Sequence, residues 1–155
     1  MNGARPASAD DLGDLAALAA LAVAELVPQR GGPLWSRTIG RQAPYEPALA
    51  AALVDPHRLL LCGTIDTSTV GYASVRLDQL ADGERLAVVE DLFTLPEARG
   101  VGVGEALMDG ILVWASAEGA VGVDAVALPG MRDTKNFFES FGLTARAIVV
   151  HRSLR

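Results

Sequence analysis

The sequence predicts one α/β domain whose central sheet mixes antiparallel and parallel strands. Three strand-like segments, 58–65, 70–77 and 86–95, follow one another with short turns between them, which is typical of an antiparallel meander. A helical pattern and a further strand-like segment come next, and this order predicts a parallel pair with a right-handed crossover. The 155 residues, 50% of them hydrophobic, suit a single core, so we expect one domain over 1–155.

The N-terminal third predicts a short strand, two helices and a long loop. A brief edge strand is expected around Arg5-Pro6, and the spacing of Ser8 and Asp11 matches a capping box, in its aspartate form, that opens a helix. An apolar stripe then continues to the helix-stopping Pro28 and consists of Leu12, Leu15, Ala19, Ala22 and Leu26. The proline- and glycine-rich segment 28–47 predicts a long loop, in which Trp35 and Tyr45 serve either packing or function. A short helix is expected over about 46–54.

The C-terminal half predicts two more helices, which brings the total to about four. The first begins in a glycine-rich loop and ends at Gly119, and a strand over 121–128 follows it. The second helix runs over about 132–141 and ends at Gly142. A final strand over 145–152 is expected to complete the sheet, or to cover an edge in a possible homodimer.

The composition excludes several classes of function. The formal net charge of −6 argues against nucleic acid or an anionic membrane surface as a partner, because both attract basic faces. Cys62 is the only cysteine and lies in an apolar run, so we expect a buried structural thiol and no disulfide. His57 and His151 have no ligand-like spacing, and we expect no metal. No signal peptide or membrane span is evident, which favours a cytoplasmic protein.

A loop with three alternate glycines at a strand-to-helix junction predicts an anion site. Without Cβ atoms, successive backbone N–H groups can converge on a phosphate at a helix N-terminus, and Arg99 would add a positive charge. The loop is not a P-loop, because Glu105-Ala106 follows Gly104, and its glycine spacing does not match the dinucleotide fingerprint. A second interpretation stays open, in which the glycines make a tight turn and allow close helix packing.

The segment from Glu90 to Gly104, EDLFTLPEARGVGVG, resembles the central motif of the GNAT superfamily, the Gcn5-related N-acetyltransferases. The order of elements along nearly the whole chain is also similar to theirs. The resemblance implies a GNAT-like sheet with a splayed parallel junction, acetyl-CoA as co-substrate and a small-molecule or peptide amine as acceptor. It also implies that main-chain groups of Leu92, Phe93 and Thr94 bind the pantetheine arm, while the pyrophosphate is held by Arg99, Gly100, Val101, Gly102, Val103, Gly104 and Glu105.

Two acidic residues interrupt the apolar strand before the loop, and Glu90 is the candidate general base. Because side chains alternate along a strand, Glu90 and Asp91 are expected on opposite faces, where only one of them can address the acceptor. The Glu-Asp-Leu-Phe run resembles that of spermidine/spermine N-acetyltransferases, in which the glutamate is thought to be the base. The alternative is that both carboxylates make structural hydrogen bonds.

Phe138 stands where many GNAT relatives carry a tyrosine that protonates the leaving thiolate. A phenylalanine has no hydroxyl, so core packing is the favoured role for this side chain. The departure also leaves room for a second function, a catalytically weak acyl-CoA-binding sensor or interaction module on the same fold.

Overall fold

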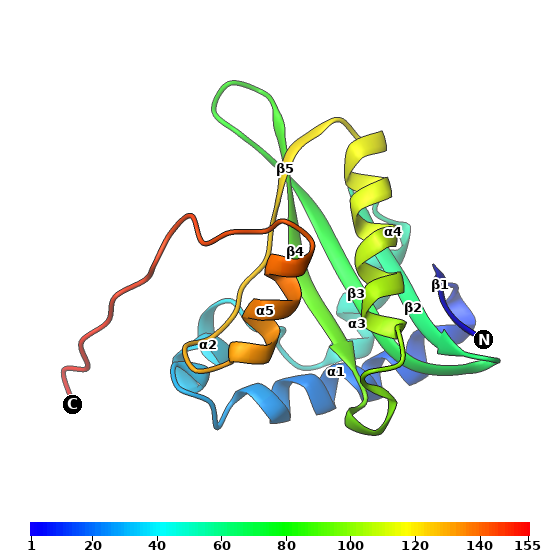
Figure 1. Ribbon diagram of the computed structural model, residues 1–155, viewed down its shortest axis with the longest axis horizontal. Coiled ribbons are helices and arrows are strands. Elements are labelled where there is room, and N and C mark those ends of the chain that lie inside the picture. The colour runs from blue at the N-terminus through cyan, green and yellow to red at the C-terminus, as the bar shows by residue number, and fades with distance from the viewer.

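The computed structural model describes residues 1–155 and contains one five-stranded sheet in the order β1-β2-β3-β4-β5 (Figure 1). Neighbouring strands from β1 to β4 are antiparallel, and β5 pairs with β4 in parallel. The mixed sheet, the edge strand and the crossover are therefore confirmed. The strands are β1 Asn2–Pro6, β2 Arg58–Ile65, β3 Ser68–Gln79, β4 Arg85–Thr94 and β5 Ala120–Asp124.

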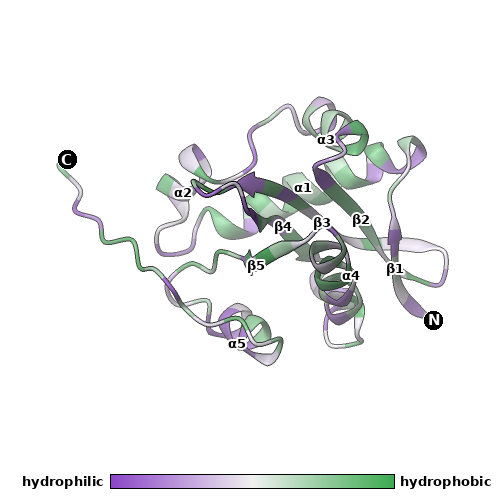
Figure 2. Cartoon of the chain, turned by 90° about the horizontal axis from the view of Figure 1, so that it is seen from above, coloured by the Kyte–Doolittle hydropathy of each residue, from purple (hydrophilic) through white to green (hydrophobic).

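Five α-helices cover the two faces of the sheet. Figure 2 shows α1 and α3 on one face, with α4 and α5 on the other. One apolar cluster lies between the sheet and α4, and a second lies between the sheet and the pair α1 and α3. The helices are α1 Leu12–Leu26, α2 Gly32–Thr38, α3 Tyr45–Val54, α4 Val103–Ala117 and α5 Arg132–Ser140.

The predicted capping box forms at Ser8 and opens the single turn Ala9–Asp11, which leads directly into α1. The Asp11 carboxylate accepts a hydrogen bond from the Ser8 amide at 2.8 Å and two from the Arg5 guanidinium, each also 2.8 Å. The Arg5 contact holds the pKa of Asp11 well below its usual range. One carboxylate thus both caps the helix and fastens it to β1.

Three elements differ from the sequence prediction: α2, β5 and the final strand. Residues 32–38 of the expected loop form α2, because Gly31 adopts φ 83° before it and Pro33 fixes the backbone of its first turn. The strand expected over 121–128 ends at Asp124.

The final strand predicted over 145–152 is wrong. Residues 143–155 form no helix or strand, and Figure 1 shows this segment running away from the body of the protein. Only Arg146 reaches β5, where its Nε lies 2.8 Å from Asp124 Oδ1, so the segment has no neighbour along which to form a ladder.

The parallel junction is splayed, as the resemblance implied. β5 pairs with β4 only at Arg85, Ala87 and Val88, so the rest of β4, up to Thr94, has no partner on that side. Where the two strands diverge, the backbone groups of β4 on that side therefore have no partner strand.

No helix is both long and apolar enough to span a membrane. No cluster of three or more potential metal ligands is present.

Candidate functional site

The glycine loop joins the end of β4 to α4 through a single turn at Pro96–Ala98. Gly100 and Gly102 adopt φ 78° and 96°, a region that disfavours side chains, and Gly102 caps α4. A Cβ at Gly104 would make only ordinary contact, 3.4 Å from the Phe137 ring, so packing there does not require a glycine. The tight turn at Gly100 and Gly102 accounts for two of the three glycines and does not exclude an anion.

The backbone amides of residues 100–105 donate no hydrogen bond within the chain. The next amide, that of Ala106, bonds the Gly102 carbonyl at 3.0 Å and starts the helical ladder. These N–H groups lie at the N-terminus of a 15-residue helix, whose dipole adds positive potential there. Val103 is buried in the core and Val101 is half-exposed, so the backbone would supply the binding groups here.

Arg99, expected to add a positive charge to the loop, is already paired with other groups. Its Nε donates to the Thr94 carbonyl at 2.9 Å, and its Nη2 contacts both Glu25 oxygens, at 3.0 and 2.7 Å. The guanidinium also lies 5.6 Å from the centre of the Phe93 ring. Arg99 therefore ties the end of β4 to α1 and neutralises its charge on Glu25.

Alternation along β4 distinguishes the three residues expected at the pantetheine. The Leu95 amide donates to Val70 of β3, so Phe93 also directs its backbone toward β3, while Leu92 and Thr94 direct theirs toward the splayed side. The Thr94 carbonyl is already occupied by Arg99. Leu92 consequently offers both an N–H and a C=O at the open edge, and Phe93 contributes its side chain to the core.

A β-bulge at Glu90 places the side chains of Glu90 and Asp91 on the same face of the sheet. Ser74 pairs with Asp91 and Val75 with Val89, which leaves Glu90 as the extra residue. Before the bulge Val89 packs in the cluster under α4, and after it Phe93 packs in the cluster under α1 and α3. The prediction that Glu90 and Asp91 face opposite sides is therefore wrong, because the extra residue cancels the alternation.

Both carboxylates line one hollow, of about 210 Å³, between β4 and the segment before and within α3. A larger hollow, of about 480 Å³, lies toward the start of β4 and includes Arg58 and Arg76, which both contact Glu90. Glu90 itself lines the smaller hollow, while its two arginine partners line the larger one. The smaller one is lined by Ile39, Gly40, Arg41, Gln42, Ala48, Glu90 and Asp91.

Asp91 forms a buried ion pair with Arg41, a residue that the sequence analysis did not identify. Arg41 Nε lies 2.6 Å from Asp91 Oδ2, its Nη2 lies 3.2 Å from Ser74 Oγ, and each charged side chain is only 9% exposed. Burial raises the pKa of Asp91, although Arg41 opposes the shift. Burial likewise raises the pKa of the nearby Tyr72 phenol, whose oxygen has no hydrogen-bond partner.

Glu90 also has basic neighbours, but they occupy its two oxygens unequally. Arg58 donates to Oε1, and Ser74 Oγ lies 3.4 Å from the same atom. Oε2 has Arg76 at 3.6 Å, beyond hydrogen-bond distance. The side chain is 20% exposed, and Oε2 is the oxygen that accepts no hydrogen bond.

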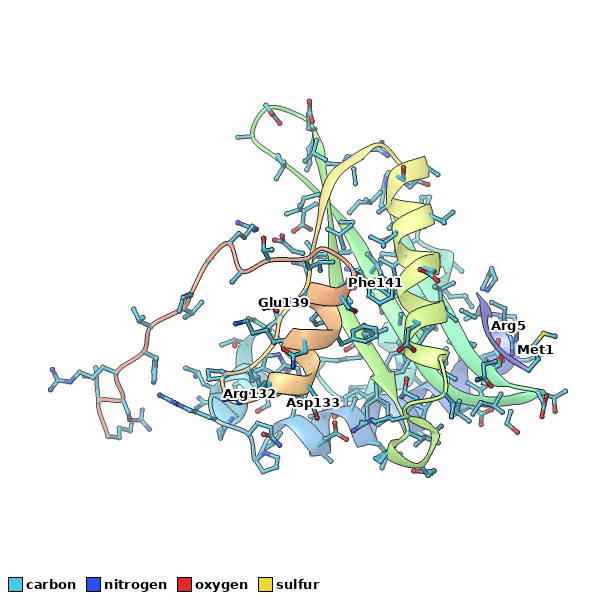
Figure 3. The ribbon with its side chains drawn as sticks, viewed as in Figure 1. Met1, Arg5, Arg132, Asp133, Glu139 and Phe141 are labelled. Carbon is cyan, nitrogen blue, oxygen red and sulfur yellow. The ribbon has the colours of Figure 1, made fainter.

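Phe138 is buried in the cluster under α4, and the expected packing role is confirmed. The Phe137 ring packs edge-on against the Phe138 ring, with the ring centres 5.7 Å apart. Its centre also lies 5.2 Å from that of the Phe141 ring, in a tilted arrangement. Figure 3 shows Phe141 turned toward the body, while Arg132, Asp133 and Glu139 lie on the outer side of α5. The helix thus supplies aromatic packing to the back of the glycine loop, and its residue 138 offers no hydroxyl.

These features agree with a comparison against protein families. The model described as the acetyltransferase (GNAT) family matches residues 18–143. The chain belongs to the GNAT family. A search of curated proteins finds no match.

Solved GNAT-like structures share the fold at low sequence identity. The BH1408 protein of Bacillus halodurans, as a tetramutant, superposes with a TM-score of 0.80 at 18% identity, covering 97% of this chain and 99% of its own. AAC(6')-Iy in complex with the bisubstrate analogue CoA-S-monomethyl-acetylneamine superposes with a TM-score of 0.75 at 18% identity, covering 100% of this chain and 99% of its own. A ribosomal-protein-alanine N-acetyltransferase of Brucella melitensis superposes with a TM-score of 0.69 at 18% identity, covering 99% of this chain and 100% of its own. One fold thus serves proteins with differently named acceptors.

Proposed function

We propose that residues 1–155 form one acyl-CoA N-acyltransferase domain that transfers an acetyl group from acetyl-CoA to a primary amine. The observation that carries this proposal is the run of unpaired amides at 100–105, placed beside the open edge of β4. Membership of the GNAT family and the similarity to a protein bound to a coenzyme A analogue support it. The acceptor would be a small molecule or a peptide, held together with acetyl-CoA in a ternary complex.

The chain would hold acetyl-CoA through its backbone. The amides of residues 100–105 would bind the pyrophosphate, because they are unpaired and lie at the positive end of α4. Leu92 would hydrogen-bond the pantetheine arm. When bound, acetyl-CoA supplies an acetyl thioester whose carbonyl carbon accepts the amine. The Leu92 N–H is also the donor best placed to stabilise negative charge on that carbonyl oxygen.

Glu90 would accept the proton that the acceptor ammonium must lose before it can attack. The bulge turns this carboxylate into the hollow beside α3, and Oε2 is the oxygen free of a hydrogen bond. Arg58 and Arg76 hold the carboxylate in place but also compete with the ammonium for it. The Arg41–Asp91 pair would build the rigid wall of the same hollow.

The leaving thiolate would take its proton from water, because Phe138 has no hydroxyl. A simple thiol has a pKa of about 8.5, so departure without a protein acid is feasible near neutral pH. This step separates the proposed enzyme from relatives with a tyrosine at that position.

The test is calorimetric titration of the purified protein with acetyl-CoA, followed by thiol-release assays across a panel of amines. We expect saturable binding and turnover with at least one class of amine. Absence of both binding and turnover would contradict the proposal.

A second function, an acyl-CoA-binding sensor or interaction module, is favoured by Phe138 and by the arginines that engage both acidic residues. Binding of acetyl-CoA without transfer to any amine of the panel would favour this module over the enzyme. The same two measurements therefore separate the two functions.

A further inference from the structure

Two arginines lie opposite each other beside Glu90, in the larger hollow. Arg58 of β2 and Arg76 of β3 are direct partners in the antiparallel register, so their side chains leave the same face of the sheet. Both line the hollow of about 480 Å³. Like charges directly opposite each other destabilise a sheet, and the carboxylates of Asp55, Asp78 and Glu90 offset this cost. The pairing gathers guanidinium donors at one point of a chain whose net charge is −6.

Each guanidinium is held by an aspartate and keeps one nitrogen unpaired. Asp78 accepts hydrogen bonds from Arg76 Nε at 2.8 Å and from Nη2 at 3.3 Å, so Arg76 Nη1 donates none. Arg58 donates from Nη1 to Glu90, and its Nε lies 3.4 Å from Asp55 Oδ2, so Nη2 donates none. The side chains of Arg58 and Arg76 are 30% and 37% exposed. Two charged donors at the hollow therefore have no partner within the chain.

These donors disfavour an acceptor that carries only positive charge. Glu90 Oε2, the oxygen that accepts no hydrogen bond, lies 3.6 Å from Arg76 Nη1. An ammonium bound to Oε2 thus lies close to a guanidinium, and repulsion between like charges in a partly buried site weakens its binding. A carboxylate attached to the acceptor removes this difficulty, because it can accept hydrogen bonds from the unpaired nitrogens.

We propose that Arg58 and Arg76 form a carboxylate subsite and that the acceptor is an amine carrying a carboxylate a few bonds away, as a free amino acid does. The inference rests on the proposed function and narrows its acceptor. The amine binds Glu90 Oε2, while the carboxylate accepts from Arg76 Nη1 and Arg58 Nη2, an arrangement that guanidinium geometry suits. The 3.6 Å between the Arg76 nitrogen and the Glu90 oxygen fits a short link between the two charged ends of the ligand.

The carboxylate would also help the reaction. In the free protein Arg58 and Arg76 compete with an ammonium for Glu90. A carboxylate that accepts from both arginines leaves Oε2 to the ammonium and to the proton that it must lose. Amines without an anionic group lack this compensation, so we expect them to be poorer acceptors.

Matched acceptors test the subsite. Each common amino acid is assayed beside its primary amide, which keeps the amine and the side chain and replaces only the carboxylate. The acid-to-amide ratio of kcat/KM is compared between the unmodified protein and Arg76→Gln, which cancels the intrinsic difference in amine basicity. We expect the ratio for the best acceptor to fall about 10- to 100-fold, mainly through KM for the acid, as for lost hydrogen bonds to a charged group.

The matched control is Arg85→Gln. Arg85 lines the same hollow, but its Nη1 lies 3.3 Å from Glu118 Oε2 and it makes no contact with Glu90. This variant removes the same charge from the hollow and should leave the ratio unchanged. An equal fall in both variants would mean that the hollow acts only through its overall charge, and would overturn the subsite.

Thermal-shift measurements, with and without coenzyme A, separate failure of the subsite from failure of the proposed function. Amino acids should raise Tm more than their amides do, and Arg76→Gln should abolish the difference. Turnover of amides as fast as that of acids would overturn the subsite and leave the acetyltransferase. Acid-selective stabilisation without turnover would support the subsite and contradict the transfer. Absence of both would overturn the two proposals together.

Discussion

Two regions of β4, its C-terminal end and the bulge in its middle, offer chemistry of opposite kinds. At its C-terminal end the groups that could bind a ligand are backbone amides, and those of residues 100–105 have no partner in the chain. At the bulge the groups are side chains, and both Glu90 and Asp91 already contact arginines. The first end is open to an anion, whereas the second must share its carboxylates with any cation that enters.

The two halves of the proposed reaction, binding of acetyl-CoA and deprotonation of the acceptor, should therefore differ in their sensitivity to mutation. Most side-chain substitutions leave the backbone N–H donors in place. Only a substitution that changes the backbone conformation of the glycines removes them. The acceptor half depends on the exact set of charges around the bulge. The predictions below test the two halves separately, from the largest expected effect to the smallest.

The largest effect is expected from Arg41→Leu. It leaves the Asp91 carboxylate buried without a partner, which should cost about 3–5 kcal/mol of unfolding free energy. Urea denaturation measures this loss. The double variant Arg41→Leu with Asp91→Leu should recover part of the stability, and a double variant less stable than the single one would contradict a dominant ion pair.

Glu90→Gln should reduce kcat by about 100-fold, the lower end of the usual range for a general base. The loss should be greatest at low pH, where removal of the ammonium proton limits the rate. Affinity for acetyl-CoA should not change, because Glu90 lies away from the loop. An unchanged pH profile would remove Glu90 from the mechanism and leave it a structural role with Arg58.

Gly102→Val should weaken acetyl-CoA binding by about 10- to 100-fold, because a β-branched residue at φ 96° costs about 1–3 kcal/mol or displaces the amides. The matched control is Gly83→Val in the β3–β4 turn, where φ is 87° and a Cβ would meet nothing within 4 Å, while a Cβ at Gly102 would meet only Asn2 Nδ2, at 3.9 Å. Both variants should lose similar stability, so equal losses of affinity would show that the loop has no special role.

The smallest effect concerns Asp11, a structural carboxylate outside both halves. Because its folded pKa is lowered, its contribution to stability is present above about pH 4 and is lost as the pH falls through the folded value. Asp11→Asn should cost about 1–2 kcal/mol at pH 7 and progressively less in acid. Acetyl-CoA affinity should stay the same, and a pH-independent loss would contradict this role.

Local rules predicted the conformation of the glycine loop from sequence but not the surroundings of the two carboxylates. Gly100 and Gly102 follow from backbone geometry, and the Ser8–Asp11 cap follows from residue spacing. The bulge at Glu90 depends on pairing with β3, which strand alternation alone does not reveal. A buried Asp91 implies a cationic partner, but the loop offers Arg30, Arg37 and Arg41 and no local signal to choose among them.

The strand predicted over 145–152 is wrong for a related reason. Its composition favours a strand, yet a strand needs a neighbour, and β5 is met at one residue only. Propensity therefore describes what the segment can form and not where its partner lies.

The central claim, that the unpaired amides of residues 100–105 bind the pyrophosphate of acetyl-CoA, is tested most directly by comparing two ligands in calorimetric titrations. Coenzyme A and pantetheine share the thiol arm, but only coenzyme A carries the pyrophosphate. We predict that coenzyme A binds at least 100-fold more tightly and that Gly102→Val removes most of this advantage. Equal affinities for the two ligands, or an advantage that Gly102→Val leaves intact, would contradict the claim.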